Sequence, residues 1–216
     1  MSFMGLLHRL RSDEALMLAF QRGDSGAFEV VYQRHKSRLL RFVLGLGRSS
    51  GLTVAMAEEL AQDTWLSVID RIEQYSPSAK FTTYLFTVAR NGWIDWFRKC
   101  QVRRDVNVSL DVPLDVNQED GNAGAALANT EVRQERAATM ETQVEFHRLL
   151  LAIDQLPEVQ REVYLMKEEG FSLIEIATCI KQPPETVKSR LRYARNRLRE
   201  TLGGISQDSS VGGEHE

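Results

Sequence analysis

The chain has 216 residues, of which 43% are hydrophobic and 26% are charged, and its formal net charge is −3. This composition is ordinary for a soluble globular protein and excludes a fibrous chain or one that is disordered throughout. Because the net charge is slightly acidic, contact with a polyanion would have to come from cations gathered on particular helices.

The cysteine spacing and the length of the apolar runs exclude several structural features. The two cysteines, Cys100 and Cys179, lie far apart without CxxC spacing, so neither a disulfide framework nor a zinc site is predicted. No apolar run approaches the about 20 residues that span a bilayer, and the first 14 residues become charged too early for a signal peptide. We expect a cytoplasmic protein without membrane insertion, cofactor, metal or catalytic residue.

The N-terminal part predicts helices only. From Asp13 the apolar residues recur at i+3 and i+4, with a break at residues 23–26, which predicts a short helix followed by a longer one. Thr53 is expected to open a long amphipathic helix. A loop follows at residues 75–79, after which Thr82 or Thr83 can cap another helix. Helices with this much apolar surface can close a core of their own.

Helical periodicity fails from Gln101 to Met140. Proline, glycine and asparagine accumulate there, and residues 101–141 carry eight acidic against four basic side chains. This composition predicts an extended acidic linker, since a compact domain would not hold so long a loop. A second helical part begins near Thr142, and Pro157 starts its next helix.

Two helices near the C-terminus predict a helix-turn-helix. Ser172 and Glu175 have the form of a capping box, which starts a short helix. The next helix is expected to have Pro184 at its first position and Gly203 just past its end. It carries six Lys and Arg residues against two Glu, beside an apolar stripe at Val187, Leu191, Ala194 and Leu198. The alternative, an arginine-rich helix that is merely solvated, is disfavoured by the capped helix directly before it.

Two blocks of this sequence resemble known proteins. The segments LPEVQREVYLMKEEGFSLIEIA (156–177) and TVKSRLRYARNRLR (186–199) resemble region 4 of the bacterial sigma-70 family, in particular the extracytoplasmic-function (ECF) sigma factors. The segment AEELAQDTWLSVIDRIEQYSPSAKFTTYLFTVARNGWIDWFRK (57–99) resembles region 2. Two blocks in the right order are more specific than one helix-turn-helix. The resemblance implies an all-α fold: a region 2 bundle (12–100), a flexible linker (101–140), a region 4 helix-turn-helix (141–203) and a disordered tail (204–216).

The resemblance implies a sigma factor, which is not an enzyme. Such a protein binds core RNA polymerase, through the β′ clamp helices and the β flap, and directs promoter-specific transcription initiation. An anti-sigma factor is a further expected partner. The family docks the face of region 2.2 on the polymerase, and here that face carries Glu58, Glu59, Asp63, Trp65 and Asp70. From the residues alone, an amphipathic helix with a solvated acidic face would explain the same pattern.

Promoter contacts are expected in both regions. Aromatic and cationic side chains together can stack exposed bases and hold the backbone, although Phe86, Trp93 and Phe97 have the periodicity of core residues. In the family the loop 74–80 forms a pocket for a flipped base. The minus-10 candidates are Ser76, Lys80, Tyr84, Arg90, Trp96, Arg98 and Lys99. Because arginine bonding to guanine is the commonest specific contact, the minus-35 candidates are Thr186, Lys188, Ser189, Arg190, Arg192 and Arg195.

Lys181 stands where relatives usually have glycine in the turn of the helix-turn-helix. Either this lysine adopts a positive φ, at a cost on the order of 1 kcal/mol, or the turn differs. Two other classes of protein fit less well. A regulator with a sensory N-terminal half and a LuxR-type helix-turn-helix should show strands upstream, and a hydrolase or redox enzyme should show a motif such as G-x-S-x-G or a P-loop.

Overall fold

The computed structural model describes residue 8 and residues 10–108 and 140–208, with side chains described at 8, 10–102 and 144–203. Every helix or turn of helix in these ranges is of the α or 3-10 kind, which confirms the predicted all-α fold. By their internal contacts the residues divide into two compact units. One comprises residues 1–113 and 177–181, and the other comprises 114–176 and 182–216.

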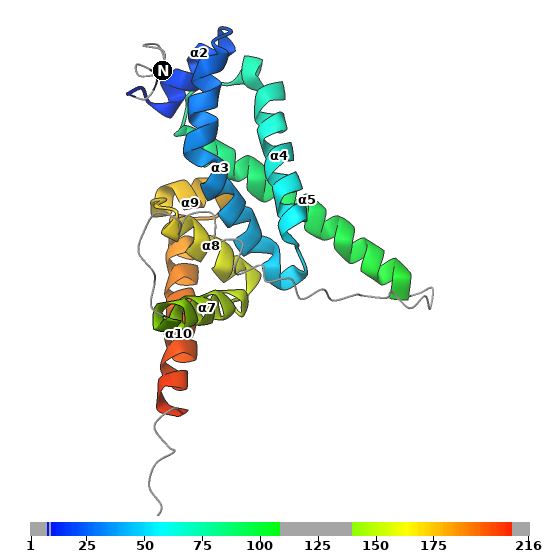
Figure 1. Ribbon diagram of the computed structural model, residues 1–216, viewed down its shortest axis with the longest axis vertical. Helices are drawn as coiled ribbons and strands as arrows, with labels where there is room; N and C mark the ends of the chain where they lie inside the picture. The colour runs from blue at the N-terminus through cyan, green and yellow to red at the C-terminus, as the bar shows by residue number, and fades with distance from the viewer. Residues whose placement is uncertain (1–7, 9, 109–139, 209–216) are drawn as a thin grey trace, which may run out of the picture. The chain divides into compact units, whose positions relative to one another are not determined.

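The first unit is built around a long central helix, α3, which contacts α2, α4 and α5, while α4 also contacts α5 (Figure 1). Two short 3-10 turns, η1 (Arg48–Ser50) and η2 (Ile72–Gln74), follow α3 and α4. The bounds of the four helices are Asp13–Gln21 (α2), Ser25–Gly47 (α3), Val54–Asp70 (α4) and Phe81–Val108 (α5).

Side-chain caps start three of these helices. Ser12 Oγ, Asp24 Oδ1 and Thr53 Oγ1 accept hydrogen bonds from the backbone N–H groups three residues later, at 3.3, 3.2 and 3.3 Å. Each cap satisfies one of the N–H groups that a helix leaves unpaired at its first turn. The predicted break between the two helices is confirmed, although it covers residues 22–24 and α3 already begins at Ser25. The predicted helix start after Thr53 is confirmed.

Aromatic residues fill the core of the first unit. Phe81, Phe86, Phe42 and Trp93 are all fully buried or nearly so, and the rings of Phe42 and Phe86 lie 4.9 Å apart between centroids. Phe97 is half-buried and stacks on Trp93. The spacing of Phe86, Trp93 and Phe97 favours a packing role, and the structure confirms it for Phe86 and Trp93.

Both ends of α5 differ from the sequence prediction. The helix begins at Phe81, so Thr82 and Thr83 lie within its first turn and neither is the N-cap. It also continues to Val108, beyond the start of the predicted linker at residue 101. The rest of the predicted linker, residues 109–139, and the tail from 209 onward lie outside the described residues.

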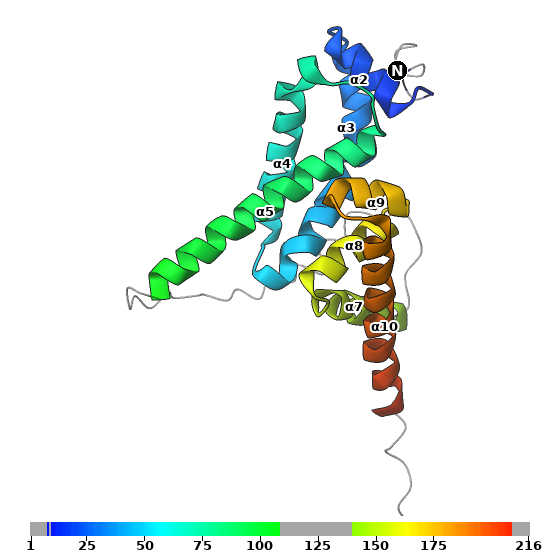
Figure 2. The ribbon, with the colours of Figure 1, turned by 180° about the vertical axis from the view of Figure 1, so that it is seen from behind.

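In the second unit, α10 contacts both α7 and α8 (Figure 2). Ala152, Ile153 and Leu156 pack against Ala194 and Leu198 of α10 to form the core. Pro157 precedes α8, as predicted, whereas Gly203 does not end α10, which runs on to Asp208. A glycine inside a helix costs only about 1 kcal/mol, so it need not stop one. The helices are Met140–Asp154 (α7), Glu158–Glu168 (α8), Leu173–Ile180 (α9) and Pro184–Asp208 (α10).

Candidate nucleic-acid interface

The helix-turn-helix is formed by α9 and α10. The Ser172 N–H donates to Glu175 Oε2 at 2.8 Å and the Glu175 N–H donates to Ser172 Oγ at 3.2 Å, which is the predicted capping box. In the turn, Lys181 has a φ of 53°, which decides between the two alternatives in favour of a positive φ. The recognition helix α10 begins at Pro184, where a missing N–H costs nothing.

The recognition helix buries one side and exposes cations on the other. Val187, Leu191, Ala194 and Leu198 are buried, as their spacing predicts. Helical periodicity places Lys188, Arg192 and Arg195 together on one flank of this stripe, and all three are exposed. Thr186 and Arg190 are half-buried on the other flank, and the exposed Ser189 lies between the two flanks. The six minus-35 candidates therefore lie around the part of α10 that is not covered by the core.

Tyr193 also lies on this surface and was not among the sequence candidates. Its side chain is 52% exposed, and the Arg192 guanidinium lies 5.1 Å from the ring centroid. A guanidinium over an aromatic face is held by a cation–π attraction. The one sequence signal for Tyr193 is an aromatic residue that falls outside the apolar stripe of its helix.

An acidic surface covers the exposed side of α4. Glu58, Glu59, Asp63 and Asp70 are exposed, whereas Trp65 is only 5% exposed and packs edge-on against Phe28 and Tyr32. Trp65 thus belongs to the core, because it lies on the buried stripe of α4. The exposed large apolar side chains of α4 are instead Leu66, which is 51% exposed and lies at i+7 from Glu59 and i+3 from Asp63, and Met56, which is 40% exposed.

The minus-10 candidates spread along α5 and the loop before it. Ser76 and Lys80 are exposed in the loop. Tyr84 is half-buried and Arg98 is exposed on the side of α5 that faces away from buried Leu85, Ala89 and Trp93. The exposed Lys99 and the half-buried Arg90 lie at the two edges, whereas Trp96, three residues after Trp93, is half-buried on the same side as the buried residues. Arg98 Nη1 is 3.9 Å from Asp95 Oδ1 on an exposed surface, so this pair is weak and leaves the guanidinium available.

Tyr75 marks the start of this loop. Its ring lies 6.2 Å from Phe81 and 5.9 Å from Tyr84, measured between centroids. Burial, followed by the nearby carboxylates of Glu14 and Asp13, raises the pKa of Tyr75 to about 12. The phenol is therefore neutral at physiological pH and packs as an aromatic ring beneath the loop.

The described residues hold no group of three or more His, Cys, Asp or Glu side chains arranged for a metal ion. Of the helices whose residues are described, none is both long and apolar enough to cross a membrane.

Comparison with known proteins identifies the family. The Sigma-70 region 2 model matches residues 31–104, and the model for Sigma-70, region 4 matches residues 146–198. RNA polymerase sigma factor CarQ of Myxococcus xanthus is 31% identical over 191 residues, which cover 88% of this chain and 97% of CarQ. The chain belongs to the sigma-70 family. ECF RNA polymerase sigma factor RpoE of Cereibacter sphaeroides is also 31% identical, over 87% of this chain and 93% of that protein.

This ECF sigma factor shares its fold with solved sigma factors. It superposes on RpoE from a complex with the anti-sigma factor NepR of Bartonella quintana, with a TM-score of 0.60 and 24% identity over 82% of this chain and 96% of that one. CnrH, solved with the cytosolic domain of CnrY, also gives a TM-score of 0.60, with 18% identity over 93% and 100% of the two chains. The predicted family, and with it a non-enzymatic function in promoter-specific transcription initiation, is confirmed.

Proposed function

We propose that this sigma factor reads the minus-35 element by placing α10 in the major groove, with Lys188, Ser189, Arg192 and Arg195 nearest the bases. The observation that carries this proposal is the exposed cationic flank beside the buried stripe of a capped recognition helix. Arginine on such a flank can bond both O6 and N7 of guanine. Thr186 and Arg190, on the opposite flank, are suited to the other wall of the groove, where phosphates lie.

The minus-10 element is read and melted by the first unit in this proposal. The half-buried rings of Tyr84 and Trp96 can stack on exposed bases, while Arg90, Arg98 and Lys99 hold the backbone. Ser76 and Lys80, exposed in the loop before α5, face a base flipped from the strand. Stacking and charge together favour single-stranded over duplex DNA, which suits a melted promoter.

Core RNA polymerase is bound by the acidic surface of α4 in the same proposal. Glu58, Glu59, Asp63 and Asp70 surround the exposed Leu66, an arrangement suited to a partner surface with basic groups around an apolar pocket. We assign this surface to the β′ clamp helices and the second unit to the β flap. Trp65 supports the surface from the core and does not reach the partner.

In this proposal region 2 extends from residue 12 to the end of α5 at Val108, and region 4 extends from the start of α7 at Met140 to the end of α10 at Asp208. The residues between them are the linker, and those after Asp208 are the tail. An anti-sigma factor is proposed as a regulator, because both similar solved structures are complexes, one with NepR and one with CnrY. The place of action is the cytoplasm, where bacterial polymerase and promoter DNA meet.

Binding to purified core polymerase tests the assignment of surfaces. Leu66→Glu adds a charge at the centre of the acidic surface, and we expect it to weaken core binding at least tenfold, a loss of about 1.4 kcal/mol. Arg192→Ala should leave core binding unchanged and lower promoter-dependent transcription. Unchanged core affinity in Leu66→Glu would remove α4 from the polymerase interface.

A further inference from the structure

The loop between η2 and α5 is fastened at both ends. Its outer side chains, at residues 76–80, are all exposed. At its start, the N–H groups of Gln74 and Tyr75 donate to the carbonyls of Arg71 and Ile72. At its end the chain enters α5 at the fully buried Phe81.

Gln21, the last residue of α2, holds the start of the loop. Its side-chain Nε2 lies 2.8 Å from the carbonyl oxygen of Ile72, 3.1 Å from that of Glu73 and 3.2 Å from that of Tyr75. These residues are more than fifty positions away in the chain. An amide has two N–H donors, so these three carbonyls share them. One side chain thus fixes the path of the backbone from η2 into the loop.

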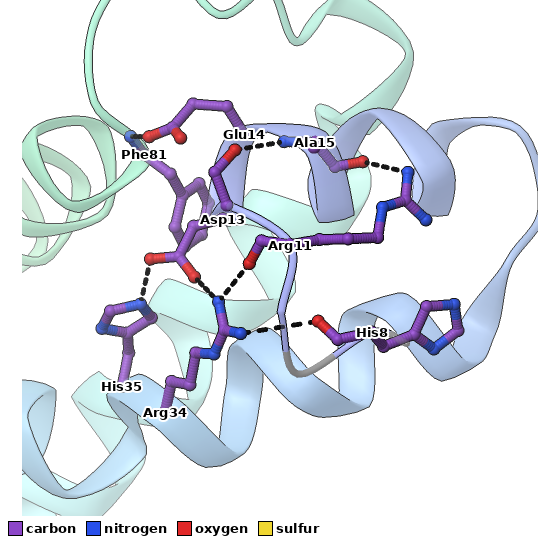
Figure 3. A network of polar contacts seen from close by, with 9 residues as sticks. His8, Arg11, Asp13, Glu14, Ala15, Arg34, His35 and Phe81 are labelled. Carbon is purple, nitrogen blue, oxygen red and sulfur yellow. Dashed lines mark hydrogen bonds and ion pairs between the residues drawn. The ribbon is translucent and has the colours of Figure 1, made fainter. Parts of the chain in front are cut away.

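Glu14, in the first turn of α2, holds the end of the loop. Its Oε1 accepts a hydrogen bond from the Phe81 N–H at 2.9 Å, across 67 positions of sequence (Figure 3). The carboxylate takes the place of the missing N-cap of α5, and negative charge at a helix N-terminus is favourable. Glu14 and Gln21 are seven residues apart, so they project from the same face of α2.

The helix α2 is itself anchored, so it is a firm base for both contacts. Asp13 Oδ2 lies 2.6 Å from His35 Nε2, and Asp13 Oδ1 lies 2.6 Å from Arg34 Nη1 (Figure 3). Both partners are on the central helix α3. The same Arg34 also donates to the backbone carbonyl of Arg11 at 3.0 Å, just before α2 begins.

We propose that Glu14 and Gln21 are positioning residues for promoter recognition, which hold the two ends of the loop so that its exposed side chains meet the minus-10 element in one geometry. This rests on the proposed assignment of the loop to the minus-10 element. Neither residue touches DNA. Their effect on base choice comes from the loss of loop freedom before binding, since a preordered loop has less conformational entropy to lose when it contacts a base.

The test uses the full chain with core polymerase and a promoter panel that carries each of the four bases at every minus-10 position. Gln21→Met removes both donors at similar size, and Glu14→Ala removes the acceptor. Each should lower discrimination at the minus-10 positions by about three- to tenfold, the worth of one or two hydrogen bonds. Glu14→Gln keeps an acceptor oxygen for Phe81 and should restore discrimination.

Gln33→Met is the matched control. Gln33 is exposed on α3 and bonds only locally, with its Nε2 2.7 Å from Glu29 Oε1. It should leave discrimination unchanged. A parallel panel with altered minus-35 bases should be unaffected in every variant, because those bases are read by the second unit. If Gln21→Met or Glu14→Ala lowers core binding or minus-35 discrimination equally, their role is general stability and the proposal is overturned.

Loop variants separate this proposal from the function on which it rests. If Ser76→Ala or Lys80→Ala changes minus-10 preference while Gln21→Met and Glu14→Ala do not, the positioning role is overturned and the loop assignment stands. If the loop variants also change nothing, the loop assignment fails and the positioning role fails with it. Amide hydrogen exchange gives a readout without DNA: the Phe81 amide should exchange faster in Glu14→Ala than in Glu14→Gln, and equal rates would contradict the contact.

Discussion

Asp13 shows how one carboxylate can hold two helices together. Burial alone would raise its pKa, but the hydrogen bonds from His35 and Arg34, aided by their charge, outweigh burial and hold the pKa below its ordinary 3.8. Because the folded-state pKa is the lower one, the stabilisation is fully present above about pH 4 and is lost as the pH falls through the folded pKa. Asp13 therefore contributes at every physiological pH.

Replacement of this carboxylate should be visible as a pH-dependent difference. We expect Asp13→Asn to lower the free energy of unfolding by about 1–3 kcal/mol near neutral pH, since it removes charged hydrogen bonds from partly buried partners. The difference from the unaltered protein should shrink as the pH falls from about 4, where Asp13 of the unfolded chain takes up a proton, through the lower folded-state pKa, where the native carboxylate does so too. Urea unfolding at a series of pH values measures this, and a difference that stays constant down to the lowest pH would contradict the role given to the ionised carboxylate.

Arg192 and Arg195 lie one turn apart on the exposed flank of α10. If they read bases, replacing either by alanine should cost roughly 1–3 kcal/mol in promoter discrimination while core binding is kept. Competition between promoters with different minus-35 bases measures the loss. Arg197→Ala removes the same charge from the opposite flank, so it should weaken binding to all promoters alike, and equal loss of discrimination in all three variants would exclude specific base contacts.

At the scale of the element, the turn between α9 and α10 stores a small strain. Lys181 has a φ of 53°, a conformation that a residue with a Cβ adopts at a cost and glycine adopts freely. We expect Lys181→Gly to stabilise the helix-turn-helix by about 0.5–1 kcal/mol, because the relief of strain exceeds the extra freedom that glycine gains in the unfolded chain. Lys181→Ala keeps the Cβ and should not stabilise. Protection of the α9 and α10 amides from hydrogen exchange would report the change, and equal protection in both variants would show that the turn is not strained.

Helix boundaries were predictable where the signal is local. The starts of α4 and α9 follow from Thr53 and from the pair Ser172 and Glu175, whose side chains bond to N–H groups three residues away. The start of α5 was not, because the group that caps Phe81 is Glu14, far away in the chain. The predicted end of α10 at Gly203 was wrong for a different reason, because glycine permits a helix to end without requiring it.

The sequence predicted which charged side chains lie on the surface of α4 better than which apolar side chains lie there. Glu58, Glu59 and Asp63 are exposed as expected, because charged groups are rarely buried unpaired. Trp65 was assigned to the polymerase surface, yet its large ring fills the space between α3 and α4. Leu66, one position later, is exposed. A helix turns by about 100° per residue, and the apolar spacing indicates that Trp65 shares the buried side of α4 with Ala61 and Val68. The assignment of Trp65 to the polymerase surface came from the resemblance to the family.

For the whole molecule, charge is separated between two surfaces. The net charge is only −3, yet α10 carries its cations beside the buried stripe and α4 carries its carboxylates around Leu66. Because surfaces of opposite charge lie on separate helices, one chain can bind DNA with the cationic surface and a protein partner with the acidic surface. The charge of each surface is therefore set by the side chains of its own helix.

This separation leads to a prediction about DNA binding by the protein alone. The minus-10 and minus-35 candidates lie in different units, and the sequence of residues 101–140 predicts a linker between them, so their spacing should become defined only when core polymerase binds both. We expect weak, strongly salt-dependent binding of promoter duplex by the free protein, with a slope set by the few phosphates that α10 can neutralise. Adding core polymerase should give tight, sequence-specific binding. Salt-titrated binding curves with and without core measure both, and specific nanomolar binding by the free protein near physiological salt would show that the two elements are engaged without the polymerase.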